Sequence, residues 1–263
     1  MKKIYLLTVI IICITSCSQV KNIAYFQNIQ GEKTFINKSS FEARIKPGDI
    51  LSITVVSSEP EASRRYNLIT PQLEDEVSSM ITQPTLQNYL VDKNGNIDFP
   101  ILGVINVQGM NKIELGQHIE KELRPFFTDE MPVITIRFMN YSVNVLGEVL
   151  HPGKYETTNE RITIFEGLAL AGDMTIYGRR DNVKVLREDA NGERNIYTLN
   201  LNDSNIFSSP AYFLEQNDVV YVEPNQSRAN SSKYGAAETY RISTISVLIS
   251  LATMAAAIVG LVR

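Results

Sequence analysis

The chain has 263 residues, of which 44% are hydrophobic and 21% are charged, and its formal net charge is −4. This length and apolar content give room for one or two compact domains with substantial cores. An acidic chain without a basic stripe is a poor candidate for binding nucleic acid, so we exclude that class of function.

Residues 1–16 have the pattern of a secretion signal. Lys2 and Lys3 form a positive start, and the apolar run from Ile4 to Ile14 has the length of a signal-peptide core and is short for a spanning helix. Because two lysines and no acids lie in this segment, the remaining chain carries a formal charge of −6.

The stretch from Ile14 to Cys17 resembles the bacterial lipobox. Cleavage would follow Ser16, and Cys17 would carry several acyl chains such as palmitate, which together make a stable membrane anchor. Ser18 in place of an aspartate favours the outer membrane. The alternative is an ordinary signal peptide that happens to contain cysteines. Cys13 would leave with the signal, so a lipidated chain would have no thiol for a disulfide.

The next two segments are predicted to be a tether and a small domain. Residues 17–42 are rich in Asn, Gln, Lys and Ser and are predicted to be a lipidated tether. Residues 43–140 are predicted to be an α+β domain. It opens with a turn at Pro47, Gly48 and Asp49, and the β-branched run that follows predicts a strand.

The rest of this first domain combines a polar excursion with three regular elements. Residues 57–88 are polar and predict a long insertion. The pair Asn94-Gly95 predicts a hairpin between its flanking strands. Asn111 followed by Glu114 predicts a capped helix that ends at Pro125, and a further strand completes the domain.

Residues 141–224 predict a second, β-rich unit. Two β segments flank a turn at His151, Pro152 and Gly153, and a helix with a Thr163–Glu166 capping box and a terminal Gly172 follows. A hairpin and the segment NDVVYVEP close the unit. That last segment is weakly similar to GDILSITV in the first domain, which suggests two related β-rich units.

The end of the chain predicts a linker over residues 225–240 and one transmembrane helix over residues 241–263. From Ile242 to Val262 the chain is apolar and uncharged, and as a helix it would span roughly 31 Å, close to the thickness of the hydrocarbon core. Small and hydroxyl residues recur every three or four positions and form one seam: Ser243, Ser246, Ser250, Thr253, Ala257 and Gly260.

This seam has three interpretations. It favours packing between helices in a membrane, or the lining of a polar, uncharged pore. The third interpretation is a lone anchor whose hydroxyls bond their own backbone carbonyls.

The sequence contains no persuasive catalytic or metal-binding set. His118 and His151 have no partner at the spacing of metal ligands. The chain has no nucleophile-elbow motif. The carboxylates of Glu74, Asp75 and Glu76 lie in the polar insertion, where solvated charge explains them. We therefore expect no enzyme activity, no metal and no cofactor.

Two of these segments resemble known domain families. The stretch IKPGDILSITV is similar to the opening of the polysaccharide export domain. The stretch VNVLGEVLHPGKYETT is similar to the soluble-ligand-binding β-grasp (SLBB) domain, most specifically at Gly147, Pro152 and Gly153. With the lipobox and the terminal helix, residues 43–224 resemble the Wza-type outer-membrane polysaccharide export lipoproteins.

The resemblance implies a fold, a function and partners. The fold is α+β, a small polysaccharide export domain followed by a β-grasp-like SLBB domain and one C-terminal transmembrane helix. The implied function is export of capsular or extracellular polysaccharide through a ring-shaped homo-oligomer, typically of eight subunits. The terminal helices would form a barrel through the outer membrane, with the Cys17 lipids in its periplasmic leaflet and the body in the periplasm. An inner-membrane chain-length regulator or tyrosine kinase is the implied partner.

The chain departs from the family pattern in three respects. Asp173 stands where the family often has a glycine, and Gln216-Asn217-Asp218 stands where a Pro-Gly-Asp turn is common. One SLBB unit is visible where larger members carry two, which predicts a shorter body. The rival hypotheses are a membrane-anchored glycan-binding or scaffolding lipoprotein that forms no pore, and, with little support, a periplasmic hydrolase.

Overall fold

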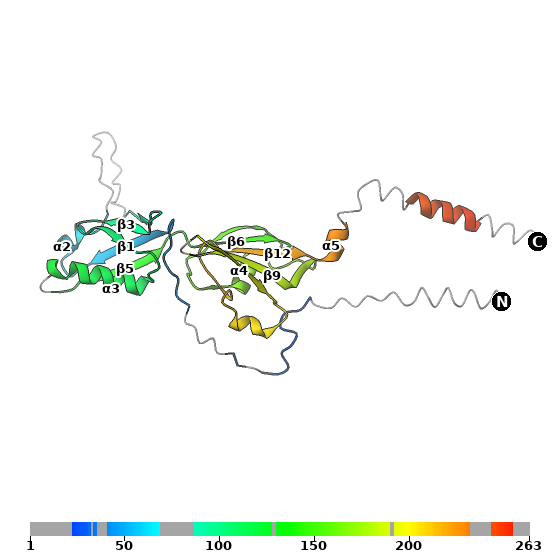
Figure 1. The fold of residues 1–263 in the computed structure, drawn as a ribbon, viewed down its shortest axis with the longest axis horizontal. Coiled ribbons are helices and arrows are strands. Elements are labelled where there is room, and N and C mark those ends of the chain that lie inside the picture. The colour runs from blue at the N-terminus through cyan, green and yellow to red at the C-terminus, as the bar shows by residue number, and fades with distance from the viewer. Residues whose placement is uncertain are drawn as a thin grey trace, which may run out of the picture.

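The structure is a computed structural model in which two lobes lie end to end (Figure 1). The first lobe holds the described residues between 41 and 140, and the second those between 141 and 224. The structure describes residues 23–32, 34–35, 41–68, 87–127, 130–189, 192–231 and 243–254. Several positions singled out above lie outside these ranges: Cys17, Glu74, Asp75, Glu76, Ala257 and Gly260. The domain boundaries given above stay predictions.

The first lobe is built on a three-stranded antiparallel sheet with β1 (Ile50–Val56) at its centre. β2 (Tyr89–Leu90) pairs with one edge of β1 and β5 (Val133–Phe138) with the other. Alternate side chains of β1 are buried, as the twofold period of a strand requires: Leu51, Ile53 and Val55.

The hairpin of the first lobe differs from the one predicted. The turn at Asn94-Gly95 is present, but β3 (Asn96–Phe99) pairs with β4 (Gly103–Asn106), and β2 pairs with β1. The carboxylate of Asp92 accepts the backbone N–H groups of Asn94 and Asn96, each at 2.8 Å, and so closes the turn locally. The strand before the turn can therefore join another sheet.

Helices cover the first lobe. The short α2 (Pro60–Arg64) follows β1, and α3 (Lys112–Leu123) packs against β5 and continues into the 3₁₀ helix η1 (Arg124–Phe126). The predicted capping box of α3 is confirmed, since Asn111 and Glu114 each accept the other's backbone N–H. The buried stripe of α3 has helical spacing: Leu115, Ile119 and Leu123.

The second lobe is built on a five-stranded sheet in the order β10-β9-β12-β6-β7. β12 and β6 are parallel, and the other neighbours are antiparallel. The bounds of these strands are β6 (Ser142–Gly147), β7 (Gly153–Glu156), β9 (Gly178–Glu188), β10 (Arg194–Leu199) and β12 (Val219–Pro224).

Short elements complete the second lobe. α4 (Ile164–Leu170) packs on the sheet through buried Ile164 and Leu168, and its predicted Thr163–Glu166 capping box is confirmed. A small ladder joins β8 (Ile162–Thr163) to β11 (Phe213–Leu214). The 3₁₀ helix η2 (Ser204–Ser208) precedes β11, and α5 (Gln226–Ser231) follows β12.

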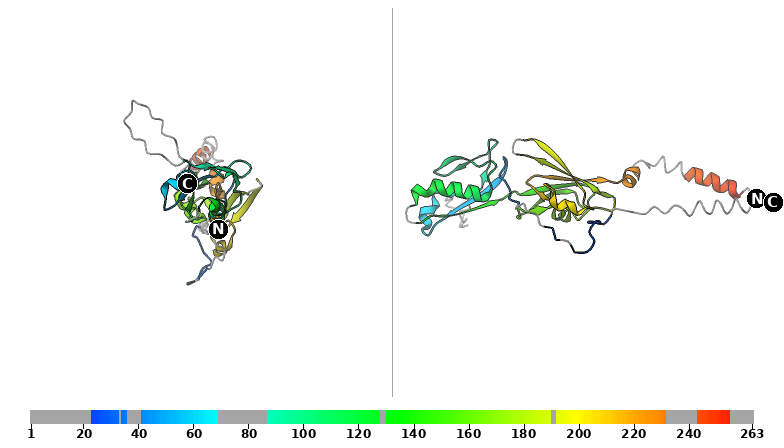
Figure 2. Two further views of the ribbon diagram at one scale, coloured as in Figure 1. Left: turned by 90° about the vertical axis from the view of Figure 1, so that its left-hand side faces the viewer. Right: turned by 60° about the horizontal axis from the view of Figure 1, so that its bottom comes forward.

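The segment of residues 23–35, which we call the strap, runs along the second lobe beside η2 (Figures 1 and 2). The backbone N–H groups of Phe26 and Gln27 donate to the carbonyls of Leu201 and Asn202. This part of the chain, predicted only as a tether, therefore has defined contacts with the folded body.

The predicted C-terminal transmembrane helix is wrong. In the part of the chain that the structure describes, no helix is both long enough and apolar enough to cross a membrane. The described part of this segment is a helix over residues 243–254.

Candidate functional site

The turn at Pro47, Gly48 and Asp49 lies where the first lobe meets the second. Gly48 has a φ of +88°, in the left-handed region that glycine adopts without steric cost. The buried carboxylate of Asp49 accepts the N–H of Lys46 at 2.8 Å, and the N–H of Asp49 donates to the carbonyl of Lys46 at 3.2 Å. The turn is thus closed by its own side chain and leads directly into β1.

The second lobe repeats this turn from Glu215 to Asp218. Asn217 has a φ of +65°, and the buried carboxylate of Asp218 accepts the N–H of Glu215 at 2.8 Å. The N–H of Asp218 donates to the carbonyl of Glu215 at 3.1 Å, and the turn leads into β12. The weak sequence similarity around Asp49 and Asp218 therefore reflects the same local structure.

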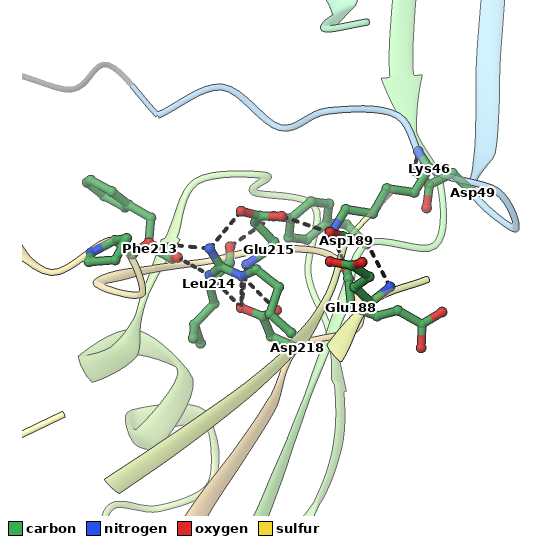
Figure 3. Close-up of polar contacts among 12 residues, drawn as sticks. Lys46, Asp49, Glu188, Asp189, Phe213, Leu214, Glu215 and Asp218 are labelled. Carbon is green, nitrogen blue, oxygen red and sulfur yellow. Dashed lines mark hydrogen bonds and ion pairs between the residues drawn. The ribbon is translucent and has the colours of Figure 1, made fainter. Parts of the chain in front are cut away.

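The first residues of the two turns bind each other across the junction. The Lys46 Nζ donates to the Glu215 carboxylate and to the Glu188 carbonyl, each at 2.8 Å (Figure 3). A second interlobe ion pair joins Lys112 to Glu160 at 2.6 Å. These two pairs, which we call the lysine clasps, join the lobes across the junction.

Arg187 anchors the turn of the second lobe from β9. Its side chain is 8% exposed, and its guanidinium binds the carboxylates of Asp218 and Glu215, each at 2.7 Å, and the carbonyl of Phe213 at 2.8 Å (Figure 3). Burial raises the pKa of Asp218, and the hydrogen bonds and charge of Arg187 oppose that rise. A buried charge is stable only when it is paired in this way.

The Arg187 network was not predicted, although the sequence holds a signal for it. Val183, Val185 and Arg187 alternate along β9 and share one face of the sheet. An arginine at an inward position points to buried acceptors, of which a buried acid is one. The sequence alone does not identify Asp218 as that acid, because the two residues come from different strands.

Asp49 has no cation equivalent to Arg187. Its Oδ1 has no hydrogen-bond partner, and burial raises the pKa of its carboxyl to about 6, although the N–H and charge of Lys46 lower it. The two equivalent aspartates therefore have different electrostatic surroundings.

A groove of about 560 Å³ lies beside these turns, between the lobes. It offers hydrogen-bonding groups and ion pairs for a polar ligand. Its charged lining has both signs: Lys46, Lys93, Arg194, Glu188 and Asp189.

A second groove, of about 870 Å³, lies between the strap and the second lobe. Its aromatic lining consists of Phe35, Phe207, Tyr212 and Phe213, and its polar lining of Asn159, Arg161, Thr163 and Glu166. An apolar surface with a few placed polar groups is typical of a small-molecule site. This combination fits a sugar ring, which has an apolar face and a rim of hydroxyls.

The remaining predicted turn residues shape the second lobe. Gly147 ends β6 with a φ of +91°, in close contact with the carbonyl of Val222. Pro152 precedes Gly153, the first residue of β7. The hydroxyl of Tyr155 donates to the carbonyl of His151 and closes this turn. We find no reactive group positioned by these residues.

The histidines lie apart and hold no metal cluster. His118 is half-buried on α3 and His151 is exposed in the β6–β7 turn. Among the residues that the structure describes, no three His, Cys, Asp or Glu side chains lie close enough together to bind a metal ion.

Part of the seam lies on the described helix of residues 243–254. The hydroxyl of Ser250 donates to the carbonyl of Ser246, and that of Thr253 to the carbonyl of Ser250, each at 2.9 Å. Ser243 and Ser246 lie on the same helix. These two hydroxyls therefore bond backbone carbonyls of their own helix.

Comparison with known proteins finds a family to which the first lobe is similar. Residues 37–139 match the family described as polysaccharide biosynthesis/export protein. The predicted resemblance to Wza-type polysaccharide export proteins is confirmed.

Two curated relatives match a longer part of the chain. The chain is 28% identical over 206 residues to the EPS I polysaccharide export outer membrane protein EpsA of Ralstonia solanacearum. It is 29% identical over 209 residues to the protein of the same name from Ralstonia nicotianae. Each match covers 77% of this chain and 52% of the relative, so the chain spans about half the length of these relatives.

Proposed function

We propose that this chain is a subunit of a system that exports extracellular or capsular polysaccharide through the outer membrane. The match of residues 37–139 to the polysaccharide biosynthesis/export family carries this proposal. Two relatives named as outer-membrane polysaccharide export proteins support it over 77% of the chain. In this function the polysaccharide is cargo, and the chain performs no chemical step.

The proposal includes an assembly and an anchor. The chain forms a ring-shaped homo-oligomer, typically of eight subunits, whose periplasmic body is held at the outer membrane by acyl chains on Cys17. An inner-membrane chain-length regulator or tyrosine kinase is its partner. The lysine clasps support this assembly, because a ring with stacked sections needs its two lobes in a fixed orientation.

Gene deletion in the native host tests the export function. We expect surface polysaccharide to disappear while polymer collects in the periplasm, and the full chain supplied in trans to restore export. Immunoblots of surface and periplasmic fractions measure both pools. Unchanged surface polysaccharide in the deletion strain would contradict the proposal.

The aromatic groove supports a second candidate function, a glycan-binding lipoprotein that forms no pore. The oligomeric mass of the acylated chain in gentle detergent separates the two. A discrete ring supports the export subunit. A monomer whose binding of polymer fragments is lost in the Tyr212→Ala variant supports the glycan-binding protein.

A further inference from the structure

The strap fixes the start of the described chain to one end of the second lobe. The hydroxyl of Tyr25 donates to the carboxylate of Asp173, and its ring lies edge-on to Phe165 with the centroids 5.5 Å apart. The guanidinium of Arg180 lies over the same ring at 5.4 Å. Asp173 has a φ of +71°, in the left-handed region that glycine adopts most easily. The glycine that the family pattern often has at this position fits that conformation. An aspartate is held here at some conformational cost.

Asp173 belongs to the end of the lobe that lies away from the junction. β12 begins beside the junction at Val219 and ends at Pro224, where the Tyr177 carbonyl accepts the N–H of Asn225. The loop from 170 to 177 binds the loop from 148 to 151 there, through the Leu150 N–H to the carbonyl of Asp173. α5 and the helix of residues 243–254 lie beyond the same end (Figures 1 and 2).

These two loops expose large apolar side chains. Leu150 is 60% exposed, Leu170 is 46% exposed and Ile176 is 63% exposed. Tyr177 stands at their edge with the guanidinium of Arg228 at 5.6 Å from its ring. We call these four side chains the end patch: Leu150, Leu170, Ile176 and Tyr177. Clustered apolar groups edged by tyrosine and arginine are typical of surfaces that contact a membrane interface.

Chain length places the proposed lipid anchor beside the end patch. Ile23 comes six positions after Cys17, and six extended residues reach about 20 Å. Because Tyr25 is bound to Asp173, acyl chains on Cys17 would hold the end of the second lobe close to the lipid surface. The end patch is then the apolar surface nearest to the membrane.

We propose that the end patch inserts into the membrane interface and, with the strap, sets the body upright on the lipid surface. This inference rests on the proposed lipid anchor at Cys17. Its occupant is lipid, because the strap would bring the proposed acyl chains to this end of the lobe, where Leu150, Leu170 and Ile176 are exposed.

A single introduced tryptophan tests the proposal, because the chain has none of its own. Ile176→Trp labels the end patch, and Val104→Trp labels β4 of the first lobe at a residue that is 72% exposed. Both acylated full-length variants are reconstituted into phosphatidylethanolamine–phosphatidylglycerol vesicles with and without brominated phosphatidylcholine. Quenching by bromine reports contact of the tryptophan with the acyl chains.

We expect bromine to reduce the emission of Ile176→Trp by about twofold or more, as for a side chain at the headgroup–acyl boundary, and to leave Val104→Trp unchanged. Unquenched Ile176→Trp in protein that sediments with vesicles would overturn the inference and leave the anchor intact. Blue-shifted but unquenched emission would show that a second copy of the chain covers the patch. Equal quenching of both variants would show that the body lies flat. Failure to sediment with vesicles would overturn the anchor together with the inference.

Discussion

Gly147 occupies a position in the sheet of the second lobe that has no room for a side chain. A Cβ at this residue would lie 2.1 Å from the carbonyl oxygen of Val222, and its φ is +91°. The neighbouring strand cannot move away without breaking the parallel pairing of β6 and β12. Steric contact and backbone conformation therefore both exclude a side chain here.

Gly147→Ala should lower the free energy of unfolding by more than about 3 kcal/mol, because it combines overpacking with a strained φ. The matched control is Gly48→Ala, whose φ is +88° but whose Cβ would meet no atom within 4 Å. That variant should lose only about 1 kcal/mol from backbone strain. Urea unfolding measures both, and equal losses would contradict the role of the Val222 contact.

Asp49 should make stability depend on pH. Burial raises the pKa of its carboxyl to about 6 from an ordinary value of 3.8. Its proton therefore stabilises the fold fully below about pH 4, and this stabilisation is lost as the pH rises through 6. The difference between the two pKa values corresponds to at most about 3 kcal/mol.

Asp49→Asn should remove this contribution, so that its stability falls less than that of the parent chain between pH 4 and pH 7. Asp92→Asn is the control, because the N–H of Asn96 lowers the pKa of Asp92 and acts in the opposite direction. Chemical denaturation across this pH range measures the slope. A slope that persists in Asp49→Asn would assign it to another group.

At the scale of elements, β9 connects the sheet of the second lobe to the junction turn. It carries both a buried and an exposed ion pair at its end, since Arg187 binds Asp218 and Glu188 binds Arg194 of β10. The side chains of Arg187 and Asp218 are 8% and 0% exposed, and those of Arg194 and Glu188 are 72% and 56% exposed. Their energetic contributions should differ accordingly.

Arg187→Met should destabilise the chain by about 3–5 kcal/mol, because it leaves the buried carboxylate of Asp218 without its cation, whereas Glu215 keeps its ion pair with Lys46. Arg194→Met should change stability by less than about 1 kcal/mol, since water screens an exposed pair. Thermal unfolding of both variants gives the comparison. Similar transition temperatures would show that Asp218 is neutral in the fold.

Local sequence signals predicted α3 and α4 well and predicted the pairing of β2 poorly. The capping residues Asn111 and Thr163 act on N–H groups three residues away, so their effect can be read directly from the chain. The partner of β2 is β1, far back in the sequence. The Asn94-Gly95 turn does not indicate which strand β2 pairs with, because that pairing is decided by burial against residues far away in the sequence.

At the scale of the whole molecule, the lysine clasps connect lobes that have separate sheets. The prediction of two β-rich units held no information about their contact, because Lys46 and Glu215 each look like ordinary surface residues in sequence. Their pairing depends on two turns that fold independently and meet at the junction.

A double variant, Lys46→Met with Lys112→Met, should leave each lobe folded and loosen their relative orientation. Spin labels on cysteines introduced at Val104 and Ile196, one in each lobe, should show a broader distance distribution than in the parent chain. Lys154→Met is the control, because its partner Glu156 lies on the same strand, β7. An unchanged distribution would mean that other contacts fix the junction.

The strap also has a consequence for the order of folding. Asn28 binds Asp203 across 175 residues of sequence, so this contact cannot form until most of the chain has been made. Long-range contacts of this kind form late, after the local ones. Closure of the strap would therefore be a late step in the folding of the second lobe.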